Sequence, residues 1–322
     1  MNILNVDPYC YSQKARQALE SFGNVEEIVY SRSQLMEKLH NVDVLILRFS
    51  HRIDQEVLDR APMLKVIATN ATGTDHIDLE YAEKRGVEVI SLKGEYEFLR
   101  NIHATAELTW GLILAGIRKI PTAFDSVKQR EWDRNRFLGN ELFGQRLGII
   151  GLGRIGEKVA NYAQAFGMDV IAYDVMPEKA LKYPFVSMCS SLIECIEKSD
   201  ILSIHVPLND ETNKLIGRNE ISLMKKNSFF VNTSRGAIVD DEALLDALTT
   251  NHIAGAALDV LEGEGVDGFV QHNNLIRYAR NNDNLLITPH IGGVTFQSWE
   301  KTELFIAEKV KQYLQYGRDK TE

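Results

Sequence analysis

Residues 147–174, LGIIGLGRIGEKVANYAQAFGMDVIAYD, decide the fold of this chain. Gly151, Gly153 and Gly156 form a G-x-G-x-x-G pattern directly after an apolar run, and a helical pattern follows at once. The first glycine permits a tight turn, the second lets the backbone approach a pyrophosphate, and the third allows a helix to pack closely on a strand. The helix N-terminus then offers free N–H groups and a positive dipole end to phosphates.

Asp174 ends the next apolar run, 23 residues after Gly151. A carboxylate there can accept hydrogen bonds from both ribose hydroxyls and would repel a 2′-phosphate, which favours NAD over NADP. The alternative is an ordinary glycine-rich turn with a solvated aspartate. Because a strand, a glycine turn, a helix and an acid occur together at the right spacing, the sequence predicts NAD binding.

Short apolar runs alternate with amphipathic stretches on both sides of this motif. Before it, strand-like runs at 2–6, 42–47, 65–69 and 86–91 alternate with helical patterns at 13–22, 54–60 and 105–118. Seven further runs, counted as strand-like, lie at 146–150, 155–166, 169–173, 201–205, 228–232, 254–258 and 285–288. A last helix is expected at 297–316, and its periodicity does not say which domain it packs on. The rhythm predicts an α/β protein with two doubly wound parallel-sheet (Rossmann-like) domains.

Composition narrows the class of partner. The 322 residues are 44% hydrophobic, enough for two cores, and the formal net charge is −9. An acidic balance argues against nucleic acid and against an anionic membrane surface, so we expect a small-molecule partner. The longest apolar stretch, 112–117, is too short to cross a bilayer.

The cysteines indicate a reducing compartment. Cys10, Cys189 and Cys195 are odd in number and their spacing suits neither a zinc site nor a disulfide framework. The N-terminus MNILNVDPYC has no charged n-region and no long apolar h-region, so we expect no signal peptide. The sequence thus predicts a cytoplasmic protein without a metal.

Polar residues follow three later strand-like runs, where an α/β sheet opens to its ligand. These are Arg235 in NTSRGAIVD, Asp259 and Glu264 in ALDVLEGEG, and His290 in TPHIGG. Reduction of a 2-keto acid needs this set of side chains. An arginine binds a carboxylate with two parallel hydrogen bonds, a histidine donates a proton near neutral pH, and a neighbouring carboxylate stabilises the charged histidine.

Each of these residues has a plainer explanation taken alone. An arginine in a polar turn is often a surface charge, a histidine after Thr-Pro is often a hydrogen-bonded loop residue, and Glu264 in an acidic glycine-rich stretch would usually be solvated. Their joint occurrence, in this order after a dinucleotide motif, favours the catalytic interpretation.

At this point the sequence resembles the D-isomer-specific 2-hydroxyacid dehydrogenase family, which includes 3-phosphoglycerate, glycerate and D-lactate dehydrogenases. The resemblance covers nearly the whole chain and rests on VIATNATGTDHIDL (66–79), ELFGQRLGIIGLGRIG (141–156), HVPLNDET (205–212), NTSRGAIVDDEAL (232–244), GAALDV (255–260) and TPHIGG (288–293). It implies an NAD-dependent oxidoreductase that transfers a hydride between nicotinamide and C2 of a small D-2-hydroxy or 2-keto acid.

The resemblance also implies a domain arrangement. Residues 1–98 with 290–322 would form a discontinuous, flavodoxin-like substrate domain, and 99–289 an NAD-binding Rossmann domain, with a cleft between them. A homodimer would form through the NAD-binding domain, using the helix at 105–118 and the polar segment 129–144. Plain core packing of that helix is the alternative.

The resemblance assigns roles to individual residues. Arg235 would bind the substrate carboxylate, His290 would be the acid and base, and Glu264 would be its partner. The expected cofactor contacts are Gly151, Gly153, Arg154, Ile155, Gly156, Asp174, His205, Val206, Pro207, Thr212, Thr233, Ser234, Asp259 and Gly292. Arg154 and Ile155 would lie under the pyrophosphate, Asp174 at the adenosine ribose and Asp259 at the carboxamide. The expected substrate contacts are Arg48, Thr72 and Gly73.

The sequence departs from the family pattern at three places. Gly265 stands where the family usually has proline after the catalytic glutamate, so Glu262, two residues before Glu264, is the alternative partner. Phe49 stands where serine is common after the residue matching Arg48. The segment 92–101 is longer than the usual connection into the long helix, and its role is open.

Other substrates and functions would require other sequence features. A phosphorylated substrate would need cations, for which Arg48, Arg52, Lys93, Arg100 and His103 are candidates, with ordinary surface charge as the alternative. Because 32 residues follow His290, we expect no added regulatory domain. Formate dehydrogenases of the wider family use glutamine in place of Glu264. An NAD-sensing corepressor would bind without turnover, and we expect it to have a longer N-terminus and a tail.

Overall fold

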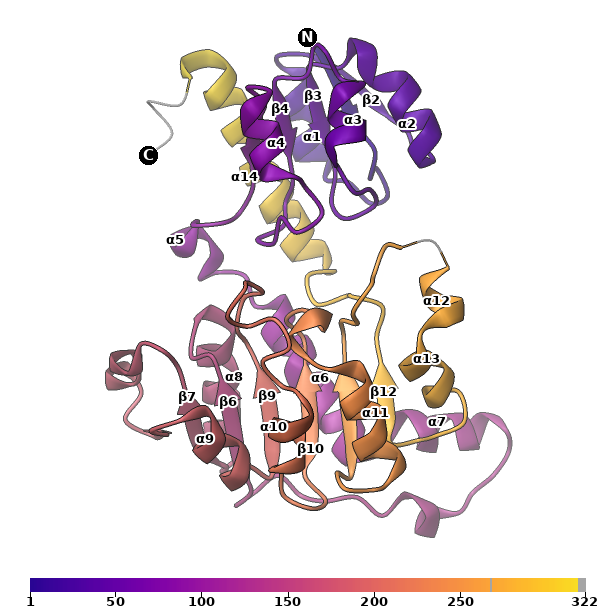
Figure 1. Cartoon of the computed structure of the whole chain (residues 1–322), viewed down its shortest axis with the longest axis vertical. Coiled ribbons are helices and arrows are strands. Elements are labelled where there is room, and N and C mark those ends of the chain that lie inside the picture. Colours follow the sequence, from indigo (N-terminus) through magenta and orange to yellow (C-terminus); the bar gives the residue numbers. More distant parts are fainter. Residues whose placement is uncertain (267, 318–322) are drawn as a thin grey trace. The chain divides into compact units, whose positions relative to one another are not determined.

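The structure is a computed structural model that describes residues 1–266 and 268–317. The chain divides into two compact units, one formed by Met1–Asn101 together with the chain from Val294 onward, the other by Ile102–Gly293. Each unit contains its own parallel sheet (Figure 1). Each also has its own apolar core. Chain crossings between the units therefore fall near residues 101 and 293.

The first unit has a five-stranded parallel sheet in the order β2-β1-β3-β4-β5, which is the flavodoxin order. The strands are β1 (Asn2–Asn5), β2 (Asn24–Glu27), β3 (Val44–Ile46), β4 (Val66–Ala68) and β5 (Glu88–Ile90). Its helices are α1 (Gln13–Glu20), α2 (Arg32–Lys38), η1 (Leu39–Asn41), α3 (Gln55–Asp59), α4 (Leu79–Lys84), α5 (Tyr96–Leu99) and α14 (Phe296–Tyr316).

The last helix, α14, belongs to the first unit. It packs along α1, and Glu303 of α14 accepts a hydrogen bond of 2.7 Å from the backbone N–H of Ser12. The two ends of the chain thus complete one unit, which periodicity alone did not decide. No helix among residues 1–266 and 268–317 is both long and apolar enough to cross a membrane.

The second unit has a seven-stranded parallel sheet in the order β12-β11-β10-β9-β6-β7-β8. The strands are β6 (Arg146–Ile150), β7 (Asp169–Tyr173), β8 (Val186–Met188), β9 (Ile201–Ile204), β10 (Phe229–Asn232), β11 (Gly255–Leu258) and β12 (Leu285–Ile287). The chain leaves β6 in one direction for β7 and β8 and returns on the other side at β9. Such a reversal of strand order is where doubly wound sheets bind ligands, at the carboxyl ends of the strands.

The helices of the second unit can be followed in Figure 1. They are α6 (Ala104–Ile117), α7 (Ile120–Lys128), η2 (Arg134–Phe137), α8 (Arg154–Ala165), η3 (Pro177–Lys182), α9 (Leu192–Lys198), α10 (Arg218–Ser222), η4 (Gly236–Ile238), α11 (Asp241–Thr249), α12 (Phe269–His272) and α13 (Asn274–Ala279). The predicted fold class, two doubly wound parallel-sheet α/β domains, is confirmed.

One element prediction was wrong, and several elements were not predicted. The run 155–166, counted as strand-like, is helix α8, and its buried Gly156, Val159, Ala160 and Ala163 follow the helical period. Strands β2 and β8 were not predicted, because both are edge strands of only three or four residues, and their sequences NVEE and VSM contain no long apolar run. Helix α7 was not predicted, and it ends just before the segment 129–144, which was expected to be irregular and contains the short helix η2.

Helix α6 packs against the second sheet and contains two glycines in contrasting surroundings. A Cβ on Gly116 would lie 2.2 Å from Cζ of Phe229 on β10, whereas a Cβ on Gly111 would meet no atom within 4 Å. Gly116 therefore permits close packing of helix on strand, while Gly111 only adds backbone freedom to the unfolded chain.

The two glycines give a matched test of this packing. We expect Gly116→Ala to lower the free energy of unfolding by about 1–3 kcal/mol, because the methyl group overpacks a rigid site. Gly111→Ala should raise it by about 0.5–1 kcal/mol through helix propensity. Urea denaturation of both variants measures the difference, and equal effects would contradict the close approach of α6 to Phe229.

Candidate active site

The glycine turn between β6 and α8 leaves open space for a pyrophosphate. Gly151 has a positive φ of +95°, and a Cβ there would lie 2.6 Å from the carbonyl oxygen of His205. A Cβ on Gly156 would lie 2.2 Å from the carbonyl oxygen of Gly151, so the helix packs directly on the turn. A Cβ on Gly153 would meet nothing within 4 Å. Two glycines thus serve packing and the third faces free space, which fits NAD at this turn.

The residues that begin α8 have different surroundings. Gly153 caps the helix without a side chain, and Arg154 and Ile155 are its first two residues. Burial lowers the pKa of Arg154, and Ile155 packs against the apolar cluster under the sheet. The free N–H groups of this first turn can receive an anion.

Asp174 follows β7 and lies beside the glycine turn. Its Oδ2 accepts a hydrogen bond of 2.8 Å from the backbone N–H of Leu152, and its Oδ1 accepts one of 2.8 Å from that of Met176. The side chain of Lys179 donates to both oxygens, at 3.0 and 3.1 Å. Asp174 therefore lies where an adenosine ribose is expected, but with a cation beside it that the sequence analysis did not consider.

The loop after β9 holds the next predicted cofactor residues. His205 is half-buried, and burial of its ring lowers its pKa to about 3, while its Nε2 lies 2.8 Å from Oγ of Ser203. Thr212 donates a hydrogen bond of 2.6 Å to the carbonyl oxygen of Pro207 and accepts one from the backbone N–H of Asn209. These bonds close the loop that carries Val206 against the glycine turn.

The segment after β10 is tied to its neighbours on both sides. The hydroxyl of Thr233 lies 2.8 Å from that of Thr109 on α6, and Ser234 donates to the carbonyl oxygen of Ile204 at 2.7 Å. Asn232 donates to the carbonyl oxygen of Arg235 at 2.9 Å. Arg235 is thereby held at the carboxyl end of β10, and its Nη1 donates to the carbonyl oxygen of Ser234.

Asp259 fixes the turn that presents His290. The carboxylate accepts hydrogen bonds from the hydroxyl of Thr288 at 2.5 Å and from the N–H groups of Ile291 and Gly292 at 2.8 and 2.7 Å. Burial raises the pKa of Asp259, and these donors oppose the shift. Gly292 is confined as well, since a Cβ would lie 3.0 Å from the same carboxylate.

His290 and Glu264 are in direct contact. Nδ1 of His290 lies 2.6 Å from Oε2 of Glu264, and the other carboxylate oxygen accepts the N–H of Leu261 at 2.5 Å. Both side chains are about 30% exposed, at 30% and 31%, so the pair can reach a substrate. Glu262 points elsewhere, with its carboxylate 3.7 Å from Nζ of Lys214.

Arg235 is joined to the Glu264 loop through Gly236. A Cβ on Gly236 would lie 1.9 Å from the carbonyl carbon of Leu261 and 2.2 Å from the nitrogen of Glu262. Glycine is thus required next to Arg235 for the loop to approach. Asp241 at the start of α11 accepts a hydrogen bond from the N–H of Glu262, and burial together with the charge of Glu262 raises its pKa to about 6.

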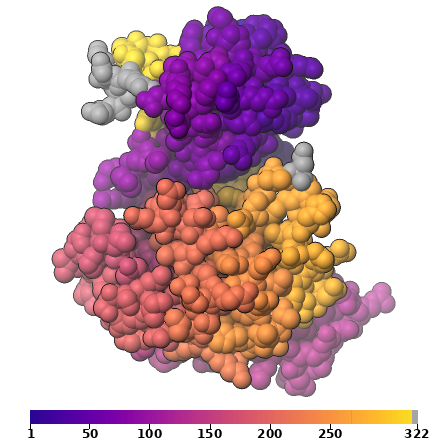
Figure 2. All heavy atoms as spheres, viewed as in Figure 1, coloured from indigo at the N-terminus to yellow at the C-terminus, as the bar shows by residue number. Residues whose placement is uncertain are grey.

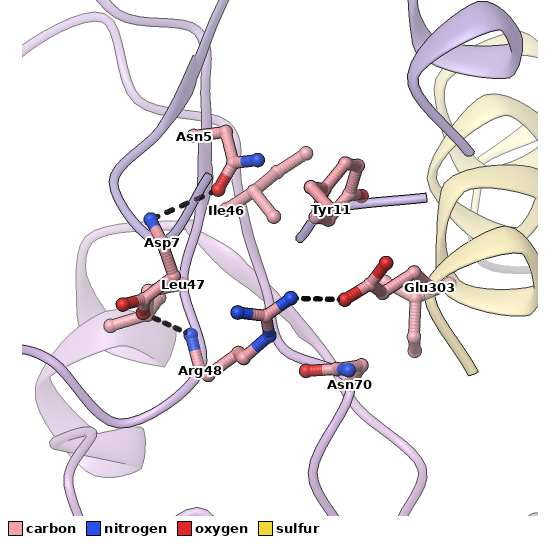
Figure 3. Close-up of a pocket in the computed structure, with 9 residues that line it drawn as sticks. Asn5, Asp7, Tyr11, Ile46, Leu47, Arg48, Asn70 and Glu303 are labelled. Atoms are coloured by element: carbon pink, nitrogen blue, oxygen red, sulfur yellow. Dashed lines mark hydrogen bonds and ion pairs between the residues drawn. The ribbon is translucent and has the colours of Figure 1, made fainter. Parts of the chain in front are cut away.

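In the first unit, Arg48 lies after β3 and is held by acidic and aromatic groups (Figure 3). Its guanidinium forms an ion pair with Glu303, which is 1% exposed, and lies 3.8 Å from the ring centroid of Trp299. Burial raises the pKa values of Glu303 and Tyr11. Tyr11, Arg48 and Glu303 line a cavity of about 10 Å³, which is room for about one water molecule. Among residues 1–266 and 268–317, Tyr11 Oη finds no hydrogen-bond partner there.

The remaining first-unit predictions lie in exposed segments. Thr72 and Gly73 lie in the loop after β4, exposed and half-buried respectively. Among the candidate phosphate cations, Arg100 is paired with Glu97 at 3.1 Å, and Arg52, Lys93 and His103 are exposed. Within 1–266 and 268–317, no three His, Cys, Asp or Glu side chains gather as metal ligands would.

Sequence reasoning missed several residues that organise the site. Lys179 lies five residues after Asp174, and a positive residue so close to the acid was a signal that could have been used. Asn232 stands directly before Thr233, and Thr288 stands two residues before His290, in the quoted motifs. Glu303 and Asp241 gave no local signal, since their partners lie far along the chain.

Comparisons with known proteins all indicate the same family. Residues 110–292 match the model of the D-isomer specific 2-hydroxyacid dehydrogenase, NAD binding domain, family. The chain is 38% identical over 316 residues to D-3-phosphoglycerate dehydrogenase of Methanocaldococcus jannaschii, covering 98% of this chain and 57% of the relative. The chain thus spans just over half the length of that relative.

Two further relatives match over most of both lengths. Glyoxylate reductase of Aeropyrum pernix is 38% identical over 288 residues, covering 87% of this chain and 82% of the relative. The solved structure of D-lactate dehydrogenase from Aquifex aeolicus, complexed with NAD and lactic acid, is 30% identical with a TM-score of 0.85, covering 98% of this chain and 96% of that one.

Proposed function

The chain belongs to the D-isomer specific 2-hydroxyacid dehydrogenase family with NAD as its cofactor, and we propose that it transfers a hydride between nicotinamide and C2 of a small 2-keto or D-2-hydroxy acid. The observation behind this proposal is the 2.6 Å contact between His290 and Glu264 in a loop that packs on Gly236, next to Arg235. An acid/base pair and a carboxylate-binding arginine then belong to the unit that contains the glycine turn.

Each residue has a defined task in this proposal. NADH, when bound, supplies the hydride to the keto carbon. Arg235 binds the substrate carboxylate through two N–H groups, which fixes the orientation of the carbonyl. His290 in its charged form donates a proton to the carbonyl oxygen as negative charge develops there, and Glu264 stabilises that charged form. In the oxidation direction, neutral His290 accepts the hydroxyl proton.

The first unit is proposed to hold the rest of the substrate. Arg48, Thr72 and Gly73 are the residues assigned to it by the resemblance to the family. Because Glu303 offsets the charge of Arg48, a keto acid with an uncharged tail fits better than a phosphorylated one. Turnover of NADH with glyoxylate, pyruvate, hydroxypyruvate and phosphohydroxypyruvate tests the function, and binding of NADH without turnover of any 2-keto acid would contradict it.

Arg235→Lys tests the carboxylate site. The substitution keeps the charge but loses the planar fork, so kcat/KM should fall by about a hundredfold or more. The affinity for NADH should change little. Arg218→Lys, on a surface arginine paired with Asp246, is the matched control and should leave kcat/KM unchanged. Near-normal activity of Arg235→Lys would move the carboxylate site elsewhere.

Glu264→Gln tests the acid/base pair. We expect kcat to fall by about a hundredfold in both directions, because the amide no longer favours the charged imidazolium. Glu262→Gln removes the same charge two residues earlier, beside Lys214, and should keep kcat within about threefold. Steady-state kinetics of both variants decide the register, and a larger loss for Glu262→Gln would exchange the roles.

We also propose that the chain is a cytoplasmic homodimer that pairs through the second unit. Segment 120–143 exposes a series of large apolar side chains: Ile120, Phe124, Val127, Trp132, Leu138 and Phe143. Figure 2 shows part of this segment (magenta) standing out from the second unit. Trp132 is 90% exposed, which a second copy of this chain would cover. The three cysteines are free, as in a reducing compartment.

Sedimentation of the wild type and of Trp132→Glu tests the dimer. The wild type should sediment at about twice the chain mass of 36.4 kDa, and the charged side chain should shift the equilibrium toward monomer. Leu181→Glu, at an 85% exposed position outside the segment, should leave the dimer intact. A monomeric wild type, or equal behaviour of the two variants, would contradict pairing through 120–143.

A further inference from the structure

The acid expected at the adenosine ribose forms an ion pair. Nζ of Lys179 lies 3.0 Å from Oδ1 and 3.1 Å from Oδ2 of Asp174, so both oxygens share one ammonium group. The carboxylate is 6% exposed and the lysine side chain 32%. The N–H groups of Leu152 and Met176 also point at the carboxylate. Asp174 is therefore fixed in position while Lys179 keeps contact with solvent.

Local backbone structure brings the two residues together. Met176 donates its N–H to Asp174, which turns the chain directly after β7, and Pro177 then begins the short helix η3. Lys179 stands in the first part of η3 and returns to the carboxylate from there. Glu178 and Lys182 are further charged residues of η3, and Arg154 begins α8 in the same unit.

This pairing changes the electrostatic argument for cofactor choice. A lone aspartate repels a 2′-phosphate, which is why it favours NAD. With Lys179 beside it, the net charge of the pair is zero, and the repulsion is largely offset. An ammonium on a flexible stem can also turn from the carboxylate to a phosphate placed next to it.

We propose that Lys179 is a cofactor-specificity residue: it offsets Asp174 and provides a cation for a 2′-phosphate, so that the chain binds NADPH as well as NADH. The proposal concerns the ribose end of the cofactor alone. It holds whichever acid the enzyme reduces, and failure of the proposed substrate chemistry would leave it standing.

The test is a binding titration, followed by the fluorescence of the reduced nicotinamide, with NADH and NADPH in separate experiments. The wild type should bind both cofactors, with NADH the tighter. Lys179→Met should weaken NADPH binding by about tenfold and leave NADH within about threefold, since only the 2′-phosphate loses a partner. Lys179→Arg keeps the charge and should preserve the wild-type ratio of the two dissociation constants.

Two controls separate this role from general charge effects. Lys182→Met removes the same charge three residues later in η3 and should leave the ratio unchanged. Asp174→Ala should shift the ratio toward NADPH, in the direction opposite to Lys179→Met. Raising the NaCl concentration should weaken NADPH binding to the wild type more than to Lys179→Met.

Three results would overturn the proposal. The first is a wild type that fails to bind NADPH at millimolar concentration while binding NADH. The second is an unchanged ratio in Lys179→Met, with its fold verified by urea denaturation. The third is a Lys182→Met variant that shifts the ratio as much as Lys179→Met does, which would assign the effect to the general charge of η3.

Discussion

The buried carboxylate of Asp259 is the interaction on which the geometry of the site depends. Asp259 is 1% exposed, and its two carboxylate oxygens accept hydrogen bonds from the hydroxyl of Thr288 and from the N–H groups of Ile291 and Gly292. Its own carbonyl oxygen accepts the N–H of His290. His290 has a φ of +53°, which costs on the order of 1–3 kcal/mol for a residue with a side chain. The bonds to Asp259 offset that strain and aim the ring at Glu264.

Much of the fold could be predicted because its signals are local. The glycine turn at 151–156, the buried strands on either side of it and the long helix α6 each produce a pattern within a few residues. The errors fall where local signals are weak. Edge strands β2 and β8 bury little, so their sequences NVEE and VSM show no apolar run. The helical period of 155–166 was available and was misassigned.

The candidate site residues could be located for the same reason, whereas their contacts could not be predicted. Arg235, Glu264 and His290 follow strands, so position in the fold indicated them. The Arg48–Glu303 pair joins residues 255 apart, and nothing in either local sequence indicates it. Burial explains which contacts form. Glu303 is a buried residue of α14, so its charge needs a cation as partner, whereas Glu262 stays at the surface beside Lys214.

In the loop that carries Glu264, the residue after the glutamate, Gly265, determines how the glutamate side chain is held in place. Proline, usual after this glutamate in the family, holds φ near −65°, but Gly265 has a φ of +80° that proline cannot adopt. The loop therefore follows another path, with Gly263 also in the left-handed region at +86°. Its rigidity comes from outside the loop: from Gly236, against which its backbone packs, and from Asp241, which accepts the N–H of Glu262. A glycine in place of proline thus transfers the placement of Glu264 from local stiffness to tertiary packing.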